Sequence, residues 1–456
     1  MHKDSSSDTG RVTSRLIMVA LAAALVIGLV LAGLLAVAAF PSSALFGTAR
    51  TPALGSPASL LAGNVYKLYT RISWIAGIVF VLVQGAILYA ALGFRRRSDD
   101  DPEPPQTHGN NTLELLWTVI PSMIVLGLAF LSFREMRAEY VTDVPDTLVV
   151  KATGFRWYWA LEYADKNLGQ ASQPLTFTTA TEMVIPVGRP VKVLMDSQDV
   201  IHAFWVPQLS GKRDAVPGDR DGGYGANFVW FQADKVGRYE GQCAELCGTW
   251  HSGMRFSVIA VEEAMYDTWA KAMAEHPKAP TDPTSPAGQA FAYAKGLCAT
   301  CHMIDVVDAN GTLIPETQTA AARQSAPDVV HSEMGGTRGP NLTRVASRST
   351  FAGGMFEMND DNLRRWLTHA DVMKPGTRMN IPAQDPAMVE NLMAFLKSLA
   401  LAPSVIDPIH AVGPHGVPND LDGLGGAADE AADENGGGDE HDAKAPALDT
   451  HLESTR

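Results

Sequence analysis

Three long apolar runs constrain the fold of this 456-residue chain more than any other feature of its sequence. They cover residues 16–40, 72–94 and 113–133, and each consists almost entirely of apolar side chains. A helix of this length crosses a hydrocarbon layer of roughly 30 Å. The sequence therefore predicts a membrane protein with helices near 72–94 and 113–133 and a further apolar segment within residues 1–40.

Basic residues indicate how these helices are oriented. Three consecutive arginines at 95–97 close the second run, and Lys3, Arg11 and Arg15 precede the first. Because basic loops stay in the cytoplasm, both segments are predicted to lie there, and everything after residue 133 on the extracytoplasmic side. The small residues that end the first run also fit a cleavage site. The sequence thus leaves open whether residues 1–40 are a cleaved signal peptide or a first transmembrane helix.

The composition changes several times along the chain, which predicts a multidomain membrane protein. Segments such as TLVVKATGFRWYWALEY are rich in Val, Thr and aromatic residues, as in an all-β domain, whereas MVENLMAFLKSL has the apolar period of a helix. The tail is rich in Gly, Ala, Asp and Glu and carries most of the formal net charge of -14, which predicts a disordered, solvating segment. The predicted order is a membrane anchor at 41–134, an all-β sandwich at 135–262, a short helix and Pro-rich linker at 263–286, an all-α domain at 287–402 and a disordered acidic tail at 403–456.

The four cysteines occur in two pairs, and the first pair belongs to a cluster of soft metal ligands. EGQCAELCGTWHSGM holds Cys243, Cys247, His251 and Met254, and thiolate, imidazole and thioether ligands select copper. Two cysteines can bridge a pair of copper ions, and DSQDVIHAFWVP supplies His202 as a second imidazole. The ordinary alternatives are a disulfide, which the extracytoplasmic side permits, and a buried core histidine. The complete donor set favours copper.

The second pair lies in KGLCATCHMID, a CxxCH motif typical of covalent heme c attachment. Cys298 and Cys301 are the predicted thioether positions, and His302 is the predicted proximal iron ligand. An isolated CxxC also fits a redox or zinc site, but a directly following His in an exported chain favours heme c. A second axial ligand is expected to be a downstream Met, and Met373 and Met379 compete for this position.

The segments HAFWVP, KRDAVPG, GRYEGQCAELCGTWHSGM and GFRWYWALEY closely resemble subunit II of the heme-copper cytochrome c oxidases, over residues 66–261. The resemblance implies a cupredoxin domain with the dinuclear CuA centre. It also implies that Glu245 contributes its backbone carbonyl to copper and its carboxylate to a Mg ion at the boundary with subunit I. The copper ligands implied by the resemblance are His202, Cys243, Glu245, Cys247, His251 and Met254.

Further resemblances concern electron and proton transfer. KPGTRM resembles the methionine loop of class I cytochromes c, which favours Met379 as the axial ligand and leaves Met373 to the core. GTRGPNL resembles the loop on the histidine side of these cytochromes, which places Pro340 near His302. In the oxidase family, the position of Trp157 lies where electrons enter CuA. An ordinary alternative for Trp157 and Trp159 is a half-buried place on a strand.

The helix NTLELLWTVIP carries Glu114 at its predicted cytoplasmic end. It resembles the subunit II helix whose Glu stands at the mouth of the proton path called the K channel. The ordinary alternative is a favourable charge at a helix N-terminus, where a carboxylate reaches interfacial water.

Together these features predict the electron-entry subunit of a membrane-bound cytochrome c oxidase with a fused cytochrome c domain. Electrons are expected to pass from a donor through heme c and CuA to the heme-copper site of subunit I, where oxygen is reduced to water with proton translocation. The expected partners are subunit I and further oxidase subunits. The expected donor is a cytochrome c or a cytochrome c-containing quinol-oxidising complex, and the expected location is the bacterial cell membrane. The sequence contains no oxygen-reduction site, and we expect no nucleic acid partner.

Three other classes of protein share part of this pattern. A nitric oxide reductase with a CuA subunit agrees with the copper ligands. A thiol copper chaperone also uses Cys-x-x-x-Cys and a distant His, but it needs neither His251 with Met254 nor a fused heme. A quinol oxidase subunit II shares the anchor and the sandwich but lacks the copper ligands that this chain contains.

Overall fold

The computed structural model describes residues 56–95, 106, 108–139, 144–170, 173–218, 227–314, 339–379, 382 and 384–413. The first apolar run and most of the acidic tail lie outside these residues, so the expectations for them stay predictions. Most of the stretch 303–336, for which the sequence suggests no role, also lies outside them.

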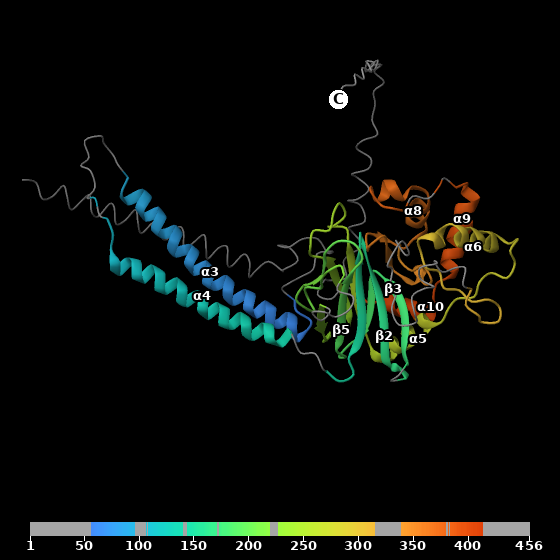
Figure 1. The fold of residues 1–456 in the computed structure, drawn as a ribbon, viewed down its shortest axis with the longest axis horizontal. Helices are drawn as coiled ribbons and strands as arrows, with labels where there is room; N and C mark the ends of the chain where they lie inside the picture. The colour runs from blue at the N-terminus through green and yellow to red at the C-terminus, as the bar shows by residue number, and fades with distance from the viewer. Residues whose placement is uncertain are drawn as a thin grey trace, which may run out of the picture. The chain divides into compact units, whose positions relative to one another are not determined.

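Two long helices form the membrane anchor: α3, Leu60–Gly93, and α4, Asn111–Glu139 (Figure 1). Both are long and apolar enough to cross a membrane. α3 begins earlier than the predicted residue 72, because Ser59 caps it by accepting a hydrogen bond from the Ala62 amide at 3.0 Å. The apolar run therefore marks the stretch suited to lipid, and the helix continues beyond it in the N-terminal direction.

The two helices run antiparallel, and the start of α3 is joined to the sandwich. Arg71, near the start of α3, lies 4.0 Å from Glu135, near the end of α4. Ala58 is 2% exposed and exchanges backbone hydrogen bonds of 2.8 Å with Gln208 and Asp234 of the sandwich. The start of α4 therefore lies at the end of the anchor that is remote from the sandwich.

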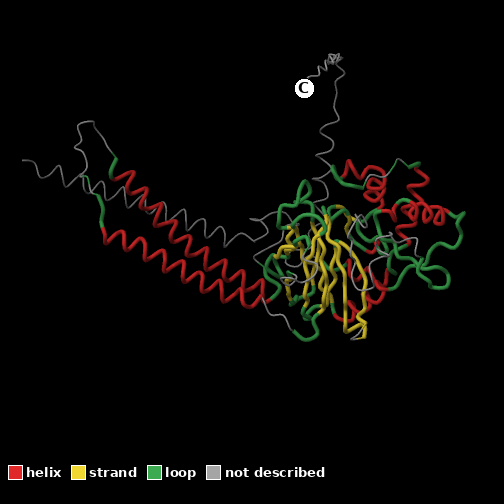
Figure 2. The backbone as a smooth tube through the Cα atoms, in the orientation of Figure 1, coloured by secondary structure: helices red, strands yellow, loops and turns green. Residues whose placement is uncertain are grey.

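The all-β domain is a sandwich of two five-stranded sheets, drawn in yellow in Figure 2. Large aromatic side chains such as Trp159, Tyr163 and Phe204 are fully buried in its core. The first sheet has the order β3-β2-β1-β5-β8 and comprises Gln173–Ala180, Tyr158–Gln170, Leu148–Phe155, Val191–Ser197 and Phe228–Phe231. The second has the order β4-β10-β9-β6-β7 and comprises Glu182–Pro186, Arg255–Val261, Gly237–Cys243, His202–Trp205 and Arg213–Ala215.

The C-terminal part of the described chain is mainly helical and has a core of its own, to which Leu363, Leu392 and Phe395 belong. Before it comes α5, Glu263–Ala274, which agrees with the predicted short helix and packs on the sandwich core through Trp269. The second domain contains the helices α6 (Pro286–Gly296), α8 (Asp360–Met373) and α9 (Pro386–Ser398). It also contains the 3-10 turns η1 (Cys298–Thr300) and η3 (Val345–Ser347) and the short strands β11 (Thr350–Phe351) and β12 (Phe356–Glu357).

The linker between the two domains is held by backbone pairing. The Ala279 amide donates to the Val307 carbonyl at 2.8 Å, and the Val307 amide donates to the Pro277 carbonyl at 3.0 Å. This part of the predicted Pro-rich linker therefore forms an ordered edge of the second domain.

A last helix, α10 at Pro403–His410, corrects the predicted start of the disordered tail at residue 403. Ile409 is 1% exposed and Ile406 is 7% exposed, and both belong to the apolar cluster of the sandwich and α5. The Arg238 amide also donates to the Gly413 carbonyl at 3.0 Å. The prediction was wrong here because the average composition of the long tail conceals a short apolar period at its beginning.

Candidate metal centre

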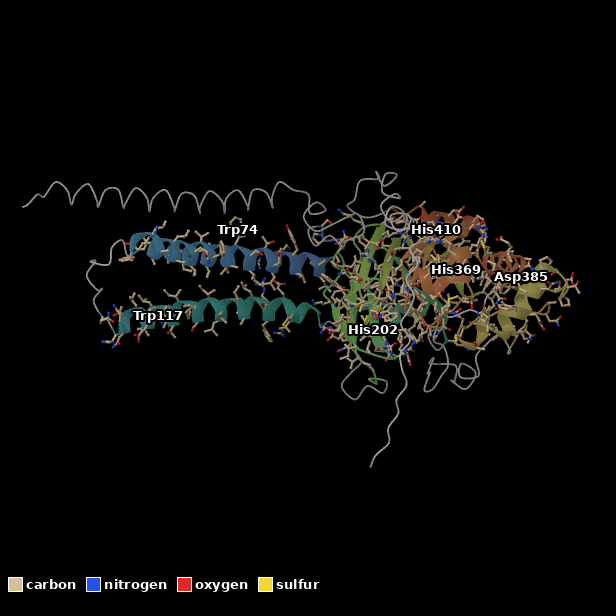
Figure 3. All side chains as sticks on the ribbon, turned by 90° about the horizontal axis from the view of Figure 1, so that it is seen from above. Trp74, Trp117, His202, His369, Asp385 and His410 are labelled. Carbon is tan, nitrogen blue, oxygen red and sulfur yellow. The ribbon has the colours of Figure 1, made fainter. Side chains whose placement is uncertain are left out.

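The predicted copper ligands come from one loop and one neighbouring strand. The loop connects β9 to β10, and pairing of these strands brings Cys243 beside Met254, whose carbonyl accepts from the Cys243 amide at 3.0 Å. Strand β6 pairs with β9 so that Phe204 lies opposite Cys243. His202 begins β6 and is therefore held over the loop, inside the sandwich domain (Figure 3).

The sulfur and nitrogen atoms of the predicted ligands converge. Cys243 Sγ lies 3.8 Å from both Cys247 Sγ and His202 Nδ1. Cys247 Sγ lies 3.7 Å from His251 Nδ1 and 3.9 Å from Met254 Sδ. Two donors that each lie about 2.3 Å from a shared metal ion in tetrahedral geometry are about 3.8 Å apart. The spacing therefore suits metal binding.

The remaining predicted ligand and the state of the cysteines agree with this geometry. The Glu245 carbonyl oxygen lies 3.2 Å from Cys243 Sγ. Cys243 and Cys247 are free, and their sulfur separation of 3.8 Å is far from the roughly 2.05 Å of a disulfide. Among the described residues, His202, Cys243 and Cys247 form a buried group of potential metal ligands. Soft donors of this kind select copper.

An acidic side chain orients His202. Asp199 Oδ1 lies 2.9 Å from His202 Nε2, so the other ring nitrogen, Nδ1, faces the cysteines. The Asp199 carboxylate also accepts from the Arg156 amide at 2.9 Å and from Arg156 Nε at 3.3 Å. Burial opposes its charge, but the hydrogen bonds to His202, Arg156 and Val200 prevail and lower the pKa of Asp199 to about 2. A charged Asp199 thus fixes the imidazole, as carboxylates do behind metal-bound histidines.

The two thiols of the loop are electrostatically coupled. The hydrogen bond between the two thiols is the main cause that lowers the pKa of Cys243 and raises the pKa of Cys247. Metal ligation requires both thiolates, so copper binding is expected to be coupled to proton release.

Trp157 lies in the tight turn between β1 and β2 and not on a strand. Its Nε1 donates to the Cys247 carbonyl at 3.3 Å, so its indole contacts the ligand loop directly. Trp159 is fully buried, with its ring 5.8 Å from the His202 ring. The ordinary alternative of a half-buried strand position therefore holds only in part: Trp157 is half-buried but lies in a turn beside the loop, whereas Trp159 lies on β2 but is fully buried.

The CxxCH residues lie at the start of the second domain. Cys298 begins the 3-10 turn η1, and the His302 amide donates to the Cys298 carbonyl at 2.8 Å. His302 Nδ1 lies 2.8 Å from the Pro340 carbonyl, the neighbour that the sequence predicts. Burial lowers the pKa of His302. Gly339 lies flat against this ring, because a Cβ at Gly339 would come within 2.3 Å of His302 Cε1.

The two candidate axial methionines occupy different surroundings. A turn at residues 374–377 is closed by the Thr377 amide, which donates to the Lys374 carbonyl at 2.9 Å. Gly376 in this turn has a φ of 82°. Met379 follows this turn, and Met379 and Cys298 both pack against the apolar cluster of the second domain. Met373 is the last residue of α8.

Glu114 lies in the first turn of α4, at the end of the anchor remote from the sandwich. Its Oε1 accepts from the Asn110 amide at 3.3 Å, while the Asn110 side chain accepts from the Thr112 and Leu113 amides at 3.2 Å. Glu114 therefore takes part in reciprocal capping of the helix N-terminus.

Two functional neighbours escaped the sequence analysis. Asp199 orients His202, and its only sequence signal is its position three residues before that His. Gly154 lies against the His202 ring, and a Cβ there would come within 2.6 Å of His202 Cδ2. Nothing in the local sequence around Gly154 indicates this contact.

The fold and the site thus define a membrane-anchored β-sandwich protein with a site of two thiolates, two imidazoles and a thioether. Residues 148–261 match the family model described as cytochrome c oxidase subunit II, periplasmic domain, and residues 51–134 match the transmembrane domain of the same subunit. The chain belongs to the cytochrome c oxidase subunit II family.

Individual relatives agree with this assignment. The chain is 31% identical over 331 residues to cytochrome c oxidase subunit 2 of Alkalihalophilus pseudofirmus, covering 71% of this chain and 84% of that protein. It is 27% identical to the subunit 2 of Bacillus subtilis, covering 75% and 90%. Among solved structures, the periplasmic domain of subunit II of the cytochrome oxidase of Bradyrhizobium japonicum is 34% identical, covers 29% of this chain and 96% of that chain, and has a TM-score of 0.24.

The family membership establishes the coarse function and location. The chain is the electron-entry CuA subunit of an oxidoreductase complex, is associated with subunit I, and carries its copper domain outside the cytoplasm. The chemistry of the ligand set agrees with copper at this site.

Proposed function

We propose that this chain is a cytochrome c oxidase subunit II with a fused cytochrome c domain, so that its donor heme and its copper centre belong to one polypeptide. The observation that carries the proposal is the hydrogen bond of His302 Nδ1 to the Pro340 carbonyl at 2.8 Å. It leaves Nε2 available as a ligand nitrogen on a His that directly follows Cys301 in the sequence, and Cys298 and Cys301 are both free cysteines. This is the arrangement that a covalently attached heme c with a histidine ligand requires.

The second axial position supports the same proposal. Met379 packs on the same apolar cluster as Cys298, and the turn before it has Gly376 at a φ of 82°. Met379 would hold heme c together with His302, and ligation by methionine and histidine raises the potential of heme c into the range of an oxidase donor. The similarity to Alkalihalophilus subunit 2 also extends into this region, because 71% of the chain is more than residues 1–261 can supply.

The residues of the copper loop have separable roles in this proposal. Two copper ions would be held by Cys243, Cys247, His202, His251, Met254 and the Glu245 carbonyl, and Asp199 keeps His202 oriented. Bound copper and heme c supply one-electron oxidation and reduction. Trp157, whose indole donates to the Cys247 carbonyl, is the residue through which electrons enter the loop.

The exposed side of the loop is proposed to face subunit I. The Glu245 side chain is exposed and the neighbouring Leu246 is 77% exposed. An exposed apolar side chain beside a carboxylate fits a protein interface in which the Glu245 carboxylate reaches a shared Mg ion. The assembled enzyme of subunit I and further subunits lies in the bacterial cell membrane, reduces oxygen to water and translocates protons. Its donor is a cytochrome c or a cytochrome c-containing quinol-oxidising complex.

Glu114 is proposed to lie at the mouth of the proton path of the complex. Its place at the remote end of α4 supports this role, although its hydrogen bond to Asn110 also gives it a structural one. A Glu114→Gln variant keeps a hydrogen-bond acceptor for Asn110 but removes the titrating group. We expect lower oxygen consumption at unchanged complex assembly. Unchanged turnover would remove Glu114 from the proton path.

The proposed function is tested on the full-length chain, purified with its partner subunits from a host that attaches heme c. Intact mass is expected to show one covalent heme on this chain, and electron paramagnetic resonance is expected to show one electron delocalised over two copper ions, beside the heme and copper of subunit I. Met379→Leu is expected to remove the methionine-ligated heme spectrum, while the matched Met373→Leu keeps it. Absence of the delocalised two-copper signal, with Cys243 and Cys247 in a disulfide, would instead favour the chaperone class.

A further inference from the structure

A hairpin of the second domain contacts the copper ligand loop. Strands β11 and β12 are antiparallel, and their turn contains Ala352, Gly353 and Gly354 with φ values of 55°, 84° and 77°. The Gly353 carbonyl accepts from the Arg255 amide at 2.8 Å, directly after the ligand Met254. The left-handed turn thus presents a backbone carbonyl to the end of the loop.

The glycines of the hairpin permit this close approach. A Cβ at Gly353 would lie 2.5 Å from the Trp157 carbonyl oxygen, and one at Gly354 would lie 2.9 Å from the Arg255 carbonyl oxygen. Contacts below 3.0 Å leave no room for a side chain at either position. The two surfaces are therefore fitted to each other at backbone distance.

Lys374 joins three parts of this contact. It is 4% exposed, and its Nζ donates to the Ala352 carbonyl at 2.7 Å and to the Trp157 carbonyl at 3.1 Å. The same ammonium lies 5.9 Å from the centre of the Trp250 ring. Burial lowers the pKa of Lys374 to about 8. A buried ammonium with carbonyl partners in both domains fixes their separation and their relative rotation.

The loop residues on both sides of His251 contact the second domain as well. Trp250 Nε1 donates to the Pro375 carbonyl at 2.5 Å. Gly253 lies under Met355, since a Cβ at Gly253 would come within 2.6 Å of the Met355 sulfur. The second domain therefore covers the copper loop directly beside this ligand.

Glu182 of β4 anchors the base of the hairpin. Its carboxylate accepts from the Ser349 and Thr350 amides at 3.1 Å and from the Thr350 hydroxyl at 3.1 Å, and the Ser349 hydroxyl also donates to it. Arg238 lies 3.5 Å from the same carboxylate. Hydrogen bonds to a buried charge of this kind are strong, and salt screens them little.

We propose that the second domain is docked in one fixed orientation on the Trp157 and copper-loop face, with Lys374 and Glu182 as positioning residues. The proposal deepens the proposed function, since the docked domain is the one assigned heme c. The Trp157 carbonyl and the Trp250 indole nitrogen already form hydrogen bonds to the second domain of the same chain. An external donor protein is thereby directed to the second domain and away from this face. Such docking differs from a charged, transient encounter, which salt weakens.

The test is hydrogen exchange with mass spectrometry on the full-length chain in its assembled, metal-loaded complex. The Arg255 amide is the reporter because its acceptor is the Gly353 carbonyl. Lys374→Met removes the ammonium, and the matched control Lys397→Met removes an exposed one that pairs with Asp360 at 2.7 Å. We expect Lys374→Met to accelerate exchange at Arg255 and in the hairpin by at least about tenfold, or about 1.4 kcal/mol of docking free energy, and Lys397→Met to leave it unchanged.

A second readout separates fixed docking from an electrostatic encounter. Wild-type protection at Arg255 is expected to stay constant from about 0.1 M to about 1 M salt, over which the Debye length falls from about 10 Å to about 3 Å. The docking proposal would be overturned if the Arg255 amide exchanged in the wild type as fast as in the Lys374→Met variant. It would also be overturned if salt removed the protection of this amide in the wild type. Metal and heme analysis of the same samples tests the proposed function separately, because protection at Arg255 does not require that heme be present.

Discussion

Replacing Gly154 by Ala is expected to damage the copper site without touching a ligand. Gly154 lies on β1, in register with Trp159 of β2 and Ser197 of β5. A Cβ there would lie 2.6 Å from Cδ2 and 2.9 Å from Cγ of the His202 ring. Carbon atoms in contact prefer about 3.5–4.0 Å, so the ring must move by about 1 Å.

The surroundings of His202 leave the ring nowhere to move without cost. His202 is fully buried, its Nε2 is bonded to Asp199, and Trp159 packs beside it. Metal-ligand distances tolerate changes of only about 0.2 Å. We therefore expect Gly154→Ala to weaken copper binding by about 10–100-fold, as disturbance of an outer-shell partner does, which corresponds to about 1.4–2.8 kcal/mol.

The assay is a copper titration of the full-length chain, read by metal content and by electron paramagnetic resonance. Gly85→Ala is the matched control, because Gly85 lies in α3 and a Cβ there meets no atom within 4 Å. Thermal unfolding of both metal-free variants separates loss of copper affinity from loss of fold. A Gly154→Ala protein with wild-type copper affinity and a wild-type spectrum would refute the placement of His202 in the site.

Three further predictions concern the fold around the site. In the wild type, the buried Asp165 carboxylate pairs with Arg189 at 2.7 Å, and Arg189→Met leaves this charge without a partner. Denaturant titrations are expected to show a free energy of unfolding lower by about 3–5 kcal/mol. Burial raises the pKa of Asp165, but the hydrogen bonds to Arg189, Asn167 and Tyr266 lower this pKa by more than burial raises it. The pKa of Asp165 is therefore below its ordinary value. The stabilisation by Asp165 is therefore present above pH about 4 and is lost as the pH falls below it; the melting temperature of Asp165→Asn should decline less steeply with acid than that of the wild type. Ile409→Ala in α10 is expected to cost about 2–5 kcal/mol in chemical unfolding, whereas no loss would mean that this helix does not stabilise the sandwich.

Local patterns in the sequence were sufficient wherever the interacting residues are near neighbours. The membrane helices follow from apolar length, and Cys243, Cys247, His251 and Met254 follow from spacing within one loop that the structure closes on itself. In each of these cases the periodicity of one element or one loop sets the geometry. The bond of His302 to Pro340 joins residues far apart in the sequence and was expected only from the resemblance of GTRGPNL to a loop of class I cytochromes c.

Averages over a segment were a weaker guide. The composition of the tail indicated disorder from residue 403, yet Ile406 and Ile409 are buried in α10. The composition of TLVVKATGFRWYWALEY indicated an all-β domain but not where its strands end, and Trp157 lies in the turn between β1 and β2. A short element inside a longer segment is recognised only when its packing partner is known.

The local sequence alone therefore predicted the metal-donor side chains, the membrane anchor and the order of the domains. Tertiary structure alone decided how those parts meet. Pairing of β6 with β9 holds His202 beside Cys243, and packing of the two domains joins Lys374 to Trp157 across 217 residues. Spacing along a strand or helix is fixed by covalent geometry, whereas contacts between distant segments depend on which surfaces of the folded chain fit each other.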